Sequence, residues 1–118
     1  MALEQACLEL ISKPWGSTDL LPWSVAGHPG APIGELWFQR CDKHAPEPAL
    51  LLKLLFTQEP LSIQVHPDDA AAHAMGLPRG KTEAWYILSA APDATVGVGL
   101  KAAVTPGQLR AAIADGSI

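Results

Sequence analysis

Proline and glycine are the residues that most constrain how this chain can fold. Its 118 residues include 11 prolines and 10 glycines, which divide it into short elements joined by turns. Apolar residues make up 48% of the chain. That share is enough for a hydrophobic core, either in one modest domain or in a piece of a larger one.

Short strands dominate the expected secondary structure. The composition predicts strands over residues 34–39, 50–56, 61–66, 81–88 and 94–100. An alanine-rich helix is expected over 68–75, and Thr105-Pro106 opens a second helix that ends at Gly116. Because strands and helices do not alternate as β-α-β units, an antiparallel barrel or sandwich is favoured over a parallel sheet.

The two ends of the chain differ from its middle. Residues 2–11 have apolar positions near helical spacing but would also suit an extended arm, and 13–32 are rich in Pro, Gly, Ser and Trp. We therefore expect a loop-rich N-terminal arm over 1–33 and part of a barrel over 34–118. Since the sequence stops just after the helix ending at Gly116, the barrel is expected to be incomplete, with an open sheet edge available for pairing.

Composition argues against several classes of partner. A net charge of −4 with 8 Lys and Arg is unsuited to nucleic acid, and no apolar run is long enough to span a membrane. The N-terminus lacks the features of a secretory signal. Cys7 and Cys41 form no C-x-x-C pair, so we expect reduced thiols and a cytoplasmic protein. A small anionic substrate is compatible with the acidic net charge, because a pocket can concentrate local positive charge.

The residue pattern with most chemical meaning is L-S-I-Q-V-H-P-D-D at 61–69, followed by G-K-T-E-A-W-Y-I-L at 80–88. In an extended strand Gln64 and His66 share a face, about 6.7 Å apart along the chain. Glu83 on a neighbouring strand would reach the same centre. Such ligands suit zinc, manganese, iron or nickel. On spacing alone, such a pattern is more often a polar strand face, with Glu83 and Lys81 in solvent, than a metal site.

Two other charged residues lie on expected strands. Glu35 shares a short strand with Trp37, and a salt bridge is its expected role. Lys53 interrupts an apolar strand, where it either extends from an edge into water or lines a pocket.

The motifs at 51–69 and 80–88 resemble the signature region of the type I phosphomannose isomerases in their compact bacterial form. The likeness extends to K-P-W-G at 13–16, I-G-E-L-W at 33–37 and the segment 109–118. It implies a cupin-type antiparallel β-barrel, or jelly roll, with one or two short helices. This family binds one zinc ion per site and interconverts mannose 6-phosphate and fructose 6-phosphate in carbohydrate metabolism.

The resemblance also implies roles for five residues. Gln64, His66 and Glu83 correspond to three zinc ligands, Ser62 and Lys81 correspond to substrate-binding residues, and Lys81 also serves catalysis. The family's fourth ligand, a histidine on a later strand, and its catalytic arginine have no counterpart in this chain. The isolated chain is therefore expected to be inactive. Two alternatives remain: a non-catalytic cupin fragment with an interaction or structural role, and a metal-binding cupin acting on another sugar phosphate.

Overall fold

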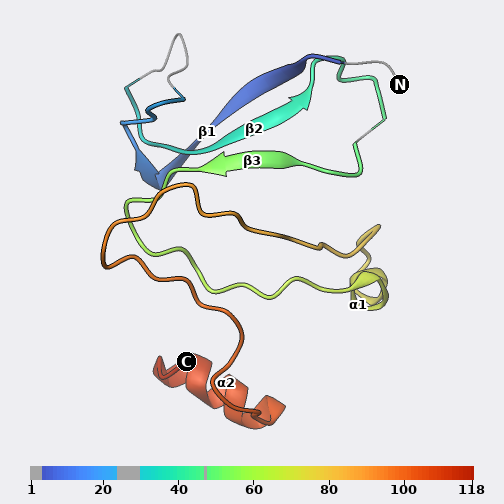
Figure 1. Cartoon of the computed structure of the whole chain (residues 1–118). Coiled ribbons are helices and arrows are strands. Elements are labelled where there is room, and N and C mark those ends of the chain that lie inside the picture. Colours follow the sequence, from blue (N-terminus) through green and yellow to red (C-terminus); the bar gives the residue numbers. More distant parts are fainter. Residues whose placement is uncertain (1–3, 24–29, 47) are drawn as a thin grey trace. The chain divides into compact units, whose positions relative to one another are not determined.

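The computed structural model describes residues 4–23, 30–46 and 48–118. The chain divides into two compact units, Met1–Ser62 and Ile63–Ile118. In the described residues, the first unit holds three strands and the second holds two helices (Figure 1). The elements are β1 (Ala6–Ser17), β2 (Ile33–Arg40), β3 (Leu52–Leu55), α1 (Asp69–Ala74) and α2 (Pro106–Asp115). The chain is thus mainly β, with two short helices.

The three strands of the first unit form an open antiparallel sheet in the order β1-β2-β3 (Figure 1). Leu10, Leu36 and Leu54 lie opposite one another across the three strands and so share one face. Leu36 is buried there with Ile33 and with Leu20 from the loop after β1. Burial of these aliphatic side chains is the main stabilising contribution to the sheet.

Strand β1 differs from the expected N-terminal arm. Residues 6–11 are extended and not helical, and they pair with β2; the loop-rich lead-in predicted from Lys13 is wrong for 13–17, which continue the strand. Register shifts on both sides of Ser12 take up the irregular K-P-W-G sequence, and proline is tolerated on an edge strand. A Cβ on Gly16 would lie 2.4 Å from the carbonyl carbon of Ile33, so the close pairing requires glycine. Residues 24–29 of the lead-in lie outside the described residues, and the division into 1–33 and 34–118 stays a prediction.

Two of the five strands expected from the sequence are present in the described residues, and three are not. Strands β2 and β3 confirm the predictions for 34–39 and for the centre of 50–56. Residues 61–66, 81–88 and 94–100 form no strand, so those three predictions are wrong for this structure. Several of their apolar side chains are exposed, with Val65 at 92%, Tyr86 at 87% and Val98 at 87%. A strand exists only where a partner completes its hydrogen bonds, and in the structure these residues have none of the ladder pairing that a strand requires.

Both helices begin at the predicted caps, and α2 also ends at its predicted glycine. Asp68 caps α1, its side chain accepting a hydrogen bond from the Ala71 amide at 2.8 Å. Thr105 and Gln108 form a reciprocal capping box at the start of α2, and Gly116 ends it with a φ of 75°. Each such N-cap contributes about 1 kcal/mol to helix stability. Neither helix, in the part of the chain that the structure describes, is long and apolar enough to cross a membrane.

The two cysteines form a disulfide, which corrects the prediction of reduced thiols. Cys7 lies opposite Gln39 in the β1–β2 register, and Cys41 follows Gln39 by two residues, on the same side of the sheet. Their Cα atoms are 5.1 Å apart, within the range a disulfide needs. The pairing depends on strand register, which the spacing of the cysteines in the sequence does not reveal. The argument from free thiols to a cytoplasmic location therefore fails, and that location stays a prediction.

Removal of this disulfide should destabilise the sheet measurably. The bond joins residues separated by 34 positions, and closing a loop of that size in the unfolded chain stabilises the folded state by about 3–4 kcal/mol. We expect urea unfolding to show this loss after reduction. The double variant Cys7→Ser/Cys41→Ser should show the lower stability of the reduced protein, and adding reductant should not change it. Equal midpoints for the oxidised and reduced protein would contradict the prediction.

Candidate functional site

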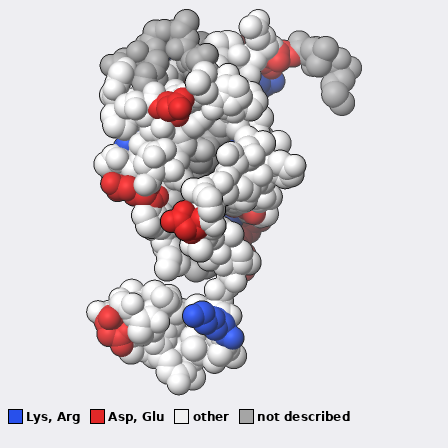
Figure 2. Space-filling view, turned by 60° about the vertical axis from the view of Figure 1, so that its left-hand side comes forward, with Lys and Arg blue, Asp and Glu red and all other residues white. Residues whose placement is uncertain are grey.

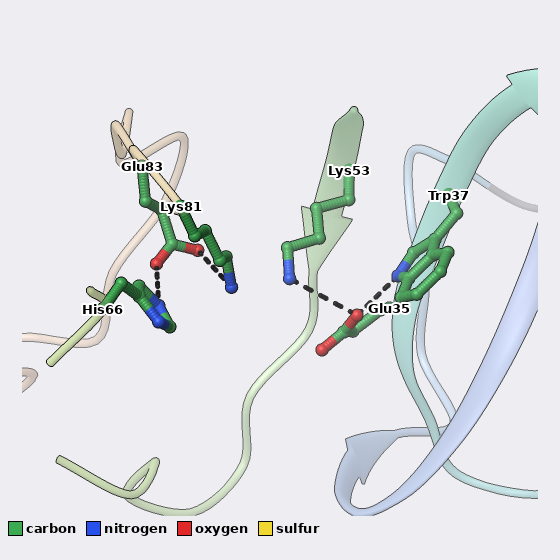
Figure 3. Close-up of polar contacts among 6 residues, drawn as sticks. All are labelled: Glu35, Trp37, Lys53, His66, Lys81 and Glu83. Carbon is green, nitrogen blue, oxygen red and sulfur yellow. Dashed lines mark hydrogen bonds and ion pairs between the residues drawn. The ribbon is translucent and has the colours of Figure 1, made fainter. Parts of the chain in front are cut away.

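Charged side chains are dispersed on the face of the molecule drawn in Figure 2. Red and blue residues are scattered there among mostly uncharged ones. The two clusters of polar contacts drawn in Figure 3 lie in different units, and each is described by itself.

The second unit brings His66 and Glu83 together. The His66 Nε2 atom lies 2.9 Å from Glu83 Oε2, although the two residues are 17 positions apart (Figure 3). Their side chains are only 23% and 24% exposed. Two of the three side chains predicted to converge therefore do meet, but the neighbouring strands expected to carry them are absent, and the convergence of Gln64 with this pair stays a prediction.

Lys81 approaches the same carboxylate from the other side. Its Nζ atom is 3.9 Å from Glu83 Oε1, and its side chain is 51% exposed (Figure 3). Glu83 thus lies between an imidazole and an ammonium group, each near a different oxygen. A long, half-exposed ion pair of this kind contributes little stability, so the lysine can exchange Glu83 for another anion at small cost.

A segment closed by a backbone hydrogen bond brings His66, Lys81 and Glu83 together. The segment between His66 and Glu83 contains α1, and the Lys81 amide donates to the Pro67 carbonyl at 3.0 Å. The chain therefore returns to its starting point after the helix. His66 immediately precedes Pro67, and Glu83 follows Lys81 by two residues, so both residues lie next to this hydrogen bond, and their side chains meet there (Figure 3).

The pair supplies two of the donor atoms that a metal ion would need. Among the described residues, no three His, Cys, Asp or Glu side chains gather as a possible metal site. A third ligand would have to be of another type, such as the amide of Gln64, two residues before His66. Gln64 and Ser62 both make interactions within the structure. Ligation by Gln64, His66 and Glu83, and substrate contact by Ser62 and Lys81, stay predictions.

The first unit holds a separate polar cluster on the sheet face opposite the leucines. Glu35 is buried, at 8% exposure, and its Oε2 atom accepts a hydrogen bond from the Trp37 indole and lies 3.6 Å from Lys53 Nζ (Figure 3). Trp37 and Lys53 are cross-strand partners, which explains why all three side chains share one face. The expected salt bridge of Glu35 is confirmed, and Lys53 is its cation.

Comparison with known proteins gives three significant relatives, all named as isomerases of one sugar phosphate. The chain is 33% identical over 110 aligned residues to the mannose-6-phosphate isomerase of Streptococcus mutans, covering 80% of this chain and 34% of that protein. Two Bacillus subtilis proteins match shorter stretches. The probable mannose-6-phosphate isomerase GmuF is 50% identical over 52 residues, covering 42% of this chain and 16% of that protein. Mannose-6-phosphate isomerase ManA is 47% identical over 49 residues, covering 40% and 15%.

These matches are partial. The alignments cover about a third or less of the relatives' own length, no family model matches, and no solved structure matches. The names nevertheless agree with the family that the motifs predicted. The resemblance is thus confirmed: this chain is similar to one part of the mannose-6-phosphate isomerases.

Proposed function

We propose that this chain is the N-terminal part of a zinc-dependent cupin that interconverts mannose 6-phosphate and fructose 6-phosphate. The observation that carries the proposal is the 2.9 Å contact between His66 and Glu83, which joins the two motifs that resemble the family's signature. The names of the three relatives support the reaction and the substrate.

The donor atoms of the pair fit a zinc ion. Ligands about 2.0–2.2 Å from a tetrahedral zinc lie about 3.3–3.6 Å from one another, so a pair at 2.9 Å needs to open only slightly. Imidazole nitrogen with carboxylate and amide oxygen is a set that zinc accepts. We propose His66, Glu83 and Gln64 as three ligands, with the fourth supplied from outside this chain. Bound there, zinc would supply Lewis-acid polarisation of the substrate's carbonyl or hydroxyl oxygen.

The protein's own side chains would hold the substrate and stabilise its developing charge. Isomerisation removes a proton from the carbon beside a carbonyl and delivers it to the neighbouring carbon, so negative charge develops on oxygen. Lys81 carries a positive charge next to Glu83, where it can hold an anionic oxygen of the substrate. Ser62 would offer a hydroxyl as a hydrogen-bond donor. Binding of the distant phosphate would fix the sugar for the reaction.

The test is an isomerase assay on the complete protein that contains this segment. With zinc bound, it should convert mannose 6-phosphate to fructose 6-phosphate in a coupled assay. Removal of zinc by a chelator should abolish turnover, and added zinc should restore it. The isolated 118-residue chain should be inactive. Full activity in a protein shown to be metal-free would refute the role of zinc, and turnover of only another sugar phosphate would refute the substrate.

A further inference from the structure

The segment that joins His66 to Glu83 is held closed by hydrogen bonds from two neighbouring backbone amides. We call residues 67–81 the α1 clip. Where its two ends meet, the Lys81 amide donates to the Pro67 carbonyl at 3.0 Å, and the Gly80 amide donates to Asp69 Oδ1 at 2.8 Å. One of these bonds joins two backbone positions and the other depends on a side chain. A substitution of Asp69 can therefore remove one of the two hydrogen bonds that close the clip.

Gly80 is required where the two ends of the clip meet. A Cβ at this position would lie 2.5 Å from the Pro67 carbonyl oxygen and 2.6 Å from the Asp68 carbonyl carbon. Both obstacles are backbone atoms, which cannot rotate away as a side chain would. Any side chain at Gly80 would force the ends of the clip apart.

Internal contacts make the clip a compact body. Ala72 of α1 is fully buried, and its carbonyl accepts a hydrogen bond from the Leu77 amide at 2.9 Å. His73 Nε2 lies 3.0 Å from the Pro78 carbonyl oxygen, within hydrogen-bonding distance. These contacts fold the segment after α1 back on the helix. The position of Gly80 relative to Asp69 is thus set by the whole clip.

We propose that Asp69 and Gly80 are positioning residues that hold His66 and Glu83 close to ligand separation before a metal ion binds. The inference rests on the proposed function, because it takes this pair as metal ligands. His66 and Glu83 leave the clip from its two tied ends, and their side chains already meet at 2.9 Å. A site formed in advance loses less conformational entropy when the ion binds, so its affinity is higher.

The chain contains a matched control for Asp69. Its neighbour Asp68 also accepts a backbone hydrogen bond, from Ala71 at 2.8 Å, but that bond caps α1 and does not join the ends of the clip. In the complete protein, Asp69→Ala should lower zinc affinity by about 10–100-fold, the usual effect of removing a residue that supports a metal ligand. Asp68→Ala should change it by less than about threefold. Asp69→Asn keeps an oxygen acceptor and should restore most of the affinity. A chelator-competition titration measures all three.

The metal-free protein provides a second readout. A nuclear Overhauser contact between the His66 and Glu83 side chains should be present in the wild type, Asp68→Ala and Asp69→Asn proteins and lost in Asp69→Ala. Equal losses of affinity in the two alanine variants would overturn the inference, because the effect would then come from helix stability. Wild-type affinity in Asp69→Ala would also overturn it. Unchanged zinc binding in His66→Ala would instead refute the proposed function, and the metal-free contact would still decide the role of Asp69.

Discussion

Replacing His66 with alanine in the complete protein is expected to remove most of its bound zinc. Imidazole is the only nitrogen donor among the three proposed ligands, and it already contacts Glu83 at 2.9 Å. Loss of a supporting residue around a metal typically costs 10–100-fold in affinity, so loss of a ligand should cost more than about 100-fold. Metal analysis after gel filtration, together with a competition titration, measures the change.

His44→Ala is the matched control for this experiment. His44 is exposed and belongs to the first unit, where its backbone amide donates to Asp42 at 2.9 Å. It is not among the proposed ligands, so the variant should keep its zinc and its activity. A His66→Ala protein that retains one tightly bound zinc would show that the ligands lie elsewhere.

How well each element of the fold could be predicted depended on how far apart in the sequence its interacting residues lie. The helix boundaries at Asp68, Thr105 and Gly116 were predictable because capping depends on residues within one turn. Strands β2 and β3 were predictable because each is apolar and has a partner within the first unit. Residues 61–66 and 81–88 have a similar composition but no ladder partner in the described structure, and composition does not reveal whether a partner is present.

The disulfide and the site show the same limit. The Cys7–Cys41 bond follows from the β1–β2 register, and the apolar spacing of residues 2–11 does not reveal that β1 is a strand. The meeting of His66 and Glu83 was predicted from the motifs, but for the wrong reason, since the α1 clip and not a pair of strands unites them. The glycine immediately before Lys81 was the available signal. Its requirement becomes clear only from the backbone of Pro67 that it approaches.

Replacing Lys81 with alanine should separate catalysis from metal binding. The lysine lies 3.9 Å from Glu83 Oε1, whereas His66 contacts the other oxygen at 2.9 Å, so its removal leaves the proposed ligand pair intact. Zinc content should remain at the wild-type level. If Lys81 stabilises an anionic oxygen of the substrate, kcat/KM for mannose 6-phosphate should fall by about 10²–10³-fold, as for other groups placed against developing charge.

Two further variants decide how Lys81 acts. Lys101→Ala removes another exposed lysine of the second unit and should leave both zinc content and kcat/KM unchanged. Lys81→Arg keeps the charge but replaces a compact ammonium with a larger planar group, so part of the activity should return. Loss of zinc together with activity in Lys81→Ala would assign the lysine to support of Glu83. Unchanged kcat/KM with zinc still bound would remove it from the substrate site, because a cation that stabilises the reacting anion cannot be deleted without slowing the reaction.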